Sequence, residues 1–234
     1  MPSELHALTF DAADPSALAR FWGDVLERDV SNDGTVLLAA DPREIPIRFR
    51  PSGRAKTGAN RFHFDLTSRS LDDQGAIVER ALAAGGRHHD VGQLPEEPHV
   101  VLADLEGNEF CVIEPGNAFL ANTGAIGALA GDGTAEVGRF WSVALGWPLV
   151  WDQDEETAIQ SPLGGTKITW GGPPVAPKTE RMRIGFELSA LDAGPERLAA
   201  EVDRLLALGA DDLGTEPVFG RILLDPDGNE FSLI

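Results

Sequence analysis

Short runs in which apolar and polar residues alternate are separated by longer segments in which apolar residues recur every three or four positions. Residues 5–11 alternate as a β-strand does. Asp14-Pro15 then supplies a helix cap and a first-turn proline, and apolar residues follow at helical spacing from Ala17 to Leu26. The pattern predicts a strand followed by a helix at the start of the chain.

The same order of elements returns along the rest of the sequence. Further strands are predicted at 28–31, 35–40, 45–50, 62–68, 99–103 and 109–114. Further helices are predicted at 71–84, 134–145 and 195–208, each ended by a glycine. Neighbouring strands joined by a few polar residues are expected to form antiparallel hairpins. The chain therefore contains four units, each made of a strand, a helix and about three strands.

The sequence also repeats itself. Arg20-Phe21-Trp22 recurs as Arg139-Phe140-Trp141, and Gly107-Asn108-Glu109-Phe110 recurs as Gly228-Asn229-Glu230-Phe231. RFHFDL at 61–66 recurs more loosely as RIGFEL at 183–188. A common offset of about 120 residues is typical of a duplicated domain rather than a solenoid. The segment 115–123 breaks the pattern, so we expect one domain at 1–116 and a second at 123–234.

Paired βαβββ units with RFW on the first helix and a closing D-x-x-G-N-E-F resemble the vicinal oxygen chelate superfamily, and its tandem glyoxalase-like branch in particular. That superfamily includes glyoxalase I, extradiol dioxygenases, fosfomycin-resistance transferases and bleomycin-binding proteins. The resemblance implies an α+β fold of two tandem glyoxalase-like domains. Each would have two βαβββ units that form a curled, mostly antiparallel cup with helices outside. Whether cups form within one half or between halves stays open, and the fold does not specify a reaction.

Strand alternation predicts which side chains face such a cup. In the strand at 62–68 the apolar residues should meet a helix, so His63, Asp65 and Thr67 should face the cup. The same reasoning turns Arg48 and Arg50 of the strand at 45–50 toward the cup. On the opening strand it turns His6, Leu8 and Phe10 inward, and on the closing strand it places Glu109 and Cys111 on one face.

The resemblance implies that His6 and His63 occupy the positions of metal ligands and approach each other across the cup. With Cys111 they would form a three-ligand site for a divalent metal, with Zn, Ni and Fe as the candidates and Asp65 or Glu109 as a candidate fourth ligand. Arg48 and Cys111, however, stand where carboxylate ligands are expected, and a guanidinium cannot ligate a metal. The expectation is therefore that no cofactor is bound, that Arg48 pairs with Asp65 and that Cys111 is a small buried side chain.

The two halves differ in their polar residues. All five histidines lie in the first half, and Gly185 and Ser232 stand at the positions that correspond to His63 and Cys111. The second half is therefore expected to lack a metal site. The tryptophans on RFW should pack in the core, whereas Trp147, Trp151 and Trp170 are candidates either for the core or for an aromatic ligand wall. Asp225–Gly228 is expected to be a hairpin turn rather than a calcium loop.

Charge and composition narrow the class of partner. Lys+Arg total 19 and Asp+Glu total 38, which gives a net charge of −19. Such a charge argues against nucleic acid or an anionic membrane as partner. The sequence shows neither a membrane-length apolar run nor a signal peptide, and its one cysteine fits a reducing compartment, so a cytoplasmic location is expected. Two fused halves predict a monomer or a weak homodimer.

Two functions remain open. The first is a protein that binds and sequesters a small molecule, as bleomycin-binding relatives do, with Asp65, Arg50 and Thr67 touching the ligand. The net charge favours a cationic ligand, whereas the arginines favour an anionic or carbonyl-bearing one. The alternative is a lyase, isomerase or dioxygenase, metal-dependent or metal-free. In that case His63 would act as base, Glu109 would move a proton and Arg48 would stabilise an oxyanion.

Overall fold

The computed structural model describes residues 3–94, 96–190, 194–217 and 219–234. The elements of the first half are β1 (Glu4–Ala12), α1 (Pro15–Leu26), β2 (Val36–Leu37), β3 (Ile47–Pro51), β4 (Phe62–Leu66), α2 (Leu71–Ala83), β5 (Arg87–His88), β6 (Val100–Ala103) and β7 (Glu109–Val112). Those of the second half are β8 (Ile126–Gly131), α3 (Ala135–Leu145), β9 (Leu149–Gln153), β10 (Glu156–Gln160), β11 (Lys167–Trp170), β12 (Ile184–Ser189), α4 (Pro195–Ala207), β13 (Asp211–Glu216), β14 (Gly220–Leu224) and β15 (Glu230–Leu233).

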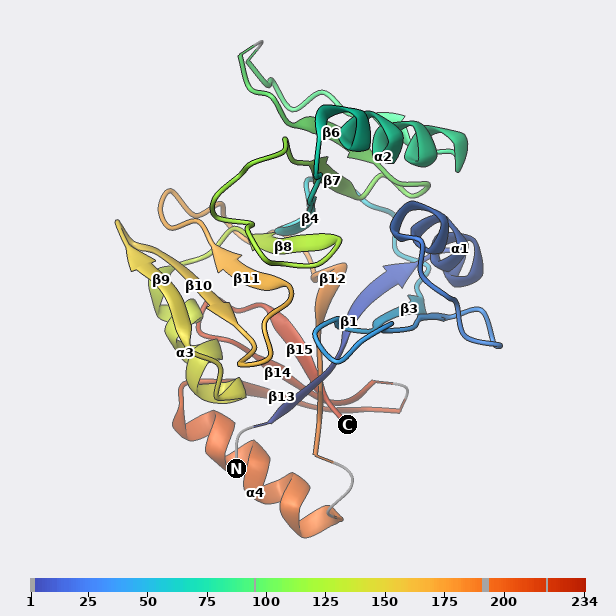
Figure 1. Cartoon of the computed structure of the whole chain (residues 1–234). Coiled ribbons are helices and arrows are strands. Elements are labelled where there is room, and N and C mark those ends of the chain that lie inside the picture. The colour runs from blue at the N-terminus through green and yellow to red at the C-terminus, as the bar shows by residue number, and fades with distance from the viewer. Residues whose placement is uncertain (1–2, 95, 191–193, 218) are drawn as a thin grey trace.

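The strands form two mixed sheets, and each sheet takes one βαβββ unit from each half (Figure 1). Sheet A has the order β13-β14-β15-β12-β1-β3-β2, and sheet B has the order β5-β6-β7-β4-β8-β11-β10-β9. The halves join where β1 pairs with β12 and where β4 pairs with β8, both antiparallel. The predicted α+β fold of four βαβββ units is confirmed, and the open question is answered: each curled sheet forms between the halves.

Local sequence explains where the helices begin and end. Asp14 caps α1 by accepting a hydrogen bond from the backbone N–H of Ala17, and Thr134 caps α3 in the same way. Gly146 ends α3 in the left-handed conformation, with φ of 67°. The predicted helices are confirmed to within two residues at each end.

The strand predicted at 28–31 is wrong. Only an isolated bridge between Val30 and Leu37 forms there. The guanidinium of Arg28 is buried and donates hydrogen bonds to the carbonyl oxygens of Leu38 at 2.9 Å and Ile45 at 3.0 Å. These bonds fold the segment into a loop around the arginine, so the segment is not extended along the sheet.

Aromatic side chains join the two sheets in one core. Phe10 of β1 and Phe64 of β4 have ring centroids 5.5 Å apart, and Phe62 of β4 lies 5.4 Å from Phe186 of β12. All four side chains are at most 3% exposed. Because each pair joins one sheet to the other, the opposite face of each sheet is left to form a hollow.

The RFW motif and the D-x-x-G-N-E-F motif, which both repeat in the sequence, contact each other in the core. The indole N–H of Trp22 in α1 donates to Asp104 in the turn after β6, at 3.2 Å. The same carboxylate accepts from the backbone N–H groups of Glu106 and Asn108 and from the Asn108 side-chain amide. The contact pins the helix of the first unit to the last turn of the second.

The second half repeats this contact. Trp141 of α3 donates to Asp225 at 3.1 Å, and the backbone N–H groups of Asp227 and Asn229 donate to the same carboxylate. Both RFW tryptophans are 1% exposed, which confirms their prediction as core residues. Asp225–Gly228 is a hairpin turn between β14 and β15, as predicted. Within the described residues, no helix combines the length and the apolar character that a membrane span requires.

Replacing Asp104 with Ala should lower the free energy of unfolding by about 2–4 kcal/mol, because several buried N–H donors would lose their acceptor. Urea unfolding of the whole chain measures the effect. Asp24→Ala, which removes an exposed carboxylate from the same helix as Trp22, should change stability by only about 0.5 kcal/mol. Equal effects of the two substitutions would show that the buried carboxylate is not a structural anchor.

Candidate functional site

The register of sheet B brings residues from both halves onto one face. One row across the sheet holds Glu109, His63, Ala130, Thr169, Ala158 and Trp151. The adjacent row holds Cys111, Asp65, Ala128, Lys167 and Gln160. His63 and Asp65 of the first half therefore lie two strands away from Thr169 and Lys167 of the second half, with Ala130 and Ala128 between them.

His63, Asp65 and Cys111 form the chemical centre of this face. The Nε2 atom of His63 lies 3.4 Å from Oδ1 of Asp65. One potential ligand atom from each of the three residues lies within 4.8 Å of the others. The His63 side chain is 37% exposed and that of Asp65 20% exposed, so a small molecule can reach them from the hollow.

The neighbours of His63 control its protonation. Burial lowers the pKa of the imidazole, but hydrogen bonds and charge attraction from Asp65 and Cys111 outweigh burial and raise the pKa to about 10. The ring is therefore an imidazolium at neutral pH. Such a group acts as a general acid or as a positive charge beside a substrate oxygen, rather than as the base predicted from the sequence.

Glu109 lies next to His63 in the row, but its carboxylate already has partners. It accepts a hydrogen bond from the Lys56 ammonium at 2.5 Å and another from the backbone N–H of Asn60 at 3.3 Å. The equivalent Glu230 makes the matching contacts with Lys178 and Met182 in the second half. A contact repeated in both halves indicates a structural role for Glu109.

Thr67 follows the end of β4, and its side chain contacts the connection between the halves. The hydroxyl donates to the carbonyl oxygen of Gly124 at 2.8 Å. The residue predicted to touch ligand thus anchors the linker.

His6 does not share a hollow with His63, because β1 belongs to sheet A and β4 to sheet B. The prediction that the two imidazoles meet is therefore wrong. An irregularity in register between Leu5 and Ala7 shifts the alternation along β1. His6 lies 3.3 Å from a guanidinium nitrogen of Arg48, whereas Leu8 and Phe10 are buried in the core.

The arginines predicted to face the cup do so on sheet A, away from His63. Arg48 donates to Glu187 of β12 at 2.9 Å, so its predicted pairing with Asp65 is wrong. Arg50 pairs with Asp11 at 3.3 Å, and its guanidinium lies 4.5 Å from the ring centroid of Phe219. The corresponding face of sheet A is therefore occupied by ion pairs between its own strands.

Sheet B instead carries a cavity of about 660 Å³ over its second-half strands. Phe119, Trp151, Lys167 and Thr169 contribute to its lining. Trp151 is 38% exposed, whereas Trp170 is 1% exposed and belongs to the core. Phe119 comes from the linker, which the sequence marked only as a seam. The sequence analysis missed Phe119, and an aromatic residue in a segment otherwise rich in Gly, Asn and Ala is the signal that could have identified it.

Comparisons with known proteins agree with this architecture. A family model described as "Glyoxalase-like domain" matches twice, at residues 7–113 and 128–234. Glyoxalase I from Zea mays shares the fold with a TM-score of 0.63 at 14% identity, over 99% of this chain and 92% of that chain. A protein from Bacillus subtilis described as a candidate dioxygenase has a TM-score of 0.60 at 14% identity, over 99% and 84%. No curated protein matches the sequence.

At this identity the solved structures establish the fold, whereas the family model matches nearly the whole sequence in two copies. The two copies agree with the repeated motifs, the four βαβββ units and the two sheets shared between halves. The chain belongs to the glyoxalase-like domain family.

Proposed function

We propose that this protein binds a small oxygen-bearing molecule in the hollow of sheet B, with His63 meeting an oxygen of the ligand. The observation that carries the proposal is the contrast between the two sheets. Sheet B carries a cavity of about 660 Å³ over its second-half strands and, two strands away in the same row as Thr169, an accessible imidazolium. The matching face of sheet A is spanned by Arg48–Glu187 and Arg50–Asp11 ion pairs. A cavity of this size suits a small organic ligand.

A second candidate is a metal-dependent enzyme of the vicinal oxygen chelate type, favoured by the His63–Asp65–Cys111 cluster. Nitrogen, carboxylate oxygen and sulfur are all zinc ligands, and catalytic zinc sites keep three protein ligands and one open position. Zinc-bound donors lie about 3.3–3.8 Å apart at tetrahedral geometry. Donors within 4.8 Å of one another need only small side-chain rotations to reach it, so the residues fit the ion.

When bound there, zinc would polarise a substrate oxygen as a Lewis acid. The metal set differs from the predicted one, because Asp65 takes the place of His6. Loading the site requires His63 to lose its proton, so metal and proton compete for one nitrogen.

The ligand proposal predicts which residues respond to binding. A library of small oxygenated molecules, screened by NMR on the ¹⁵N-labelled full chain, should contain binders that shift the amide resonances of Ala130 and Thr169 in sheet B. The amides of Thr9 and Gly185, which lie opposite each other in sheet A, are the control and should not move. Binders that shift only the sheet A amides would contradict the proposed site.

The imidazole of His63 should remain protonated at pH 8 in ¹H–¹⁵N NMR titrations, because its pKa is raised to about 10. Its pairing should stabilise the fold fully below pH 6.5, with this contribution lost as the pH rises toward 10. Asp65→Asn should lower the His63 pKa, and His6→Ala, on the other sheet, should leave it unchanged. A His63 ring that titrates near pH 6.5 in the unmodified protein would refute the pairing.

Zinc binding distinguishes the second candidate. Calorimetry at pH 8 should find one equivalent of zinc, an affinity that rises from pH 6 to pH 9, and proton release on binding. His63→Ala should remove binding and Asp65→Asn should weaken it by at least about tenfold, whereas His6→Ala should have no effect. An equal loss in His6→Ala, or the absence of zinc binding by the unmodified chain, would eliminate this site.

A further inference from the structure

We propose that the hollow of sheet B takes a planar aromatic anion, which lies against Phe119 and Trp151 and places its acid group at Lys167. This inference rests on the proposed function and names the class of ligand.

The wall of the cavity exposes apolar surface that the protein buries elsewhere. Phe119, Val150 and Trp151 are 36%, 42% and 38% exposed and line the same cavity. By contrast, Trp22 and Trp141 are each 1% exposed. Exposed aromatic side chains that converge on one cavity are typical of a binding wall rather than of scattered surface residues.

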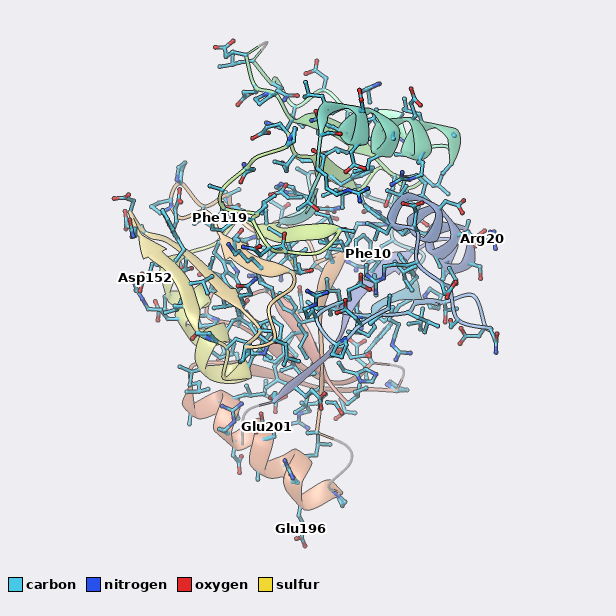
Figure 2. The ribbon with its side chains drawn as sticks, viewed as in Figure 1. Phe10, Arg20, Phe119, Asp152, Glu196 and Glu201 are labelled. Carbon is cyan, nitrogen blue, oxygen red and sulfur yellow. The ribbon has the colours of Figure 1, made fainter. Side chains whose placement is uncertain are left out.

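The rings of Phe119 and Trp151 are arranged so that the planar ring of a ligand can stack on them. Phe119 comes from the linker beside β11, and Trp151 comes from β9, next to the labelled Asp152 (Figure 2). Their centroids lie 6.2 Å apart at an interplanar angle of 87°. In an edge-to-face pair one ring presents only its edge, so its faces remain available for stacking by a planar ligand.

Two charged residues line this cavity, Lys167 and the exposed Glu156, and Lys167 is the one that contacts the aromatic wall. Its ammonium lies 4.3 Å from the centroid of the Phe119 ring and donates to the Phe119 carbonyl oxygen. The other two lysines each pair with a glutamate, whereas among the residues that the structure describes no ion pair within 4 Å includes Lys167. Partial burial lowers the pKa of Lys167, which an anionic partner would reverse.

The charge at the Phe119 ring therefore opposes the net charge of the protein. A net charge of −19 attracts cations to the molecule. Within the cavity, however, a ligand cation would meet Lys167, which already lies over the Phe119 ring where that cation would bind. An anion gains a partner for an unpaired ammonium and keeps that cation–π contact.

The register of the sheet places Lys167 between His63 and the aromatic wall. Lys167 and Asp65 lie in one row, separated by Ala128, and Thr169 and His63 lie in the next, separated by Ala130. The separation is two strand spacings, about 10 Å. Only alanine side chains intervene along these rows. The acid group at Lys167 therefore lies between His63 and the rings of the ligand, which extend over β10 toward Trp151 on β9.

Calorimetry with the full-length protein and three probe molecules tests the assignment. The probes are 2-naphthoate, a planar anion; 2-naphthylmethylamine, a planar cation; and cyclohexanecarboxylate, an anion without an aromatic face. We expect 2-naphthoate to bind at least tenfold more tightly than either of the others. Tighter binding of the planar cation would overturn the assigned charge, and equal binding of the two anions would overturn the aromatic wall.

Substitutions locate the binding. Lys167→Met should weaken 2-naphthoate binding at least tenfold, and Trp151→Leu should weaken it while leaving cyclohexanecarboxylate unchanged. Arg20→Met is the matched control, because it removes an exposed positive charge on α1, far from Phe119 (Figure 2). Thermal unfolding of each variant verifies that it is folded. Equal losses in Lys167→Met and Arg20→Met would refute the proposal.

The two proposals fail in different ways. Suppose that small molecules shift the sheet B amides but 2-naphthoate does not bind. The hollow is then a binding site for another class of ligand, and only this inference is wrong. Absence of any shift in sheet B across the library, together with no 2-naphthoate binding, would remove the proposed function itself.

Discussion

A buried hydrogen bond from a tryptophan to an aspartate organises each half of this protein. Trp22 binds Asp104 and Trp141 binds Asp225, so the first helix of each half is fixed to the last turn of the same half. The two units of a half are thereby held against each other through their aromatic core. The opening strands of the first half, β1 and β4, face each other through Phe10 and Phe64 and belong to different sheets. The exposed edges of β1 and β4 find partners in the other half, β12 and β8, which explains why both sheets cross the duplication.

This arrangement makes the proposed binding site a joint product of the two halves. The acid, thiol and imidazole groups come from β4 and β7, whereas Lys167 and Trp151 come from β11 and β9. Neither half contains the complete hollow. The same crossing places Arg48 opposite Glu187, where each neutralises the other across the junction of sheet A. Ion pairs thus span this face of sheet A, whereas a cavity lies on the corresponding face of sheet B.

The sequence predicted the local structure better than the pairing. Cap residues, glycine stops and apolar spacing placed the helices because those signals act within a few residues. The partner of β1 could not be predicted, because pairing with β4 or with β12 satisfies the same alternation of apolar and polar residues. The prediction that His6 faces His63 was wrong for a second reason. The irregular register beside His6 breaks the two-residue period on which its assignment depended. His63, Asp65 and Cys111 lie on the neighbouring strands β4 and β7, so the alternation of apolar and polar residues was enough to predict that they share a face.

The duplication provides an internal test of which residues hold the fold and which serve the site. Trp22, Asp104 and Glu109 have identical counterparts that make the same contacts in the second half. His63 and Cys111 correspond instead to Gly185 and Ser232. A residue that makes the same buried contact in both copies supports the architecture that the copies share. The architecture that the two copies share therefore does not require the imidazole or the thiol, which agrees with the proposed role of this face in binding a ligand.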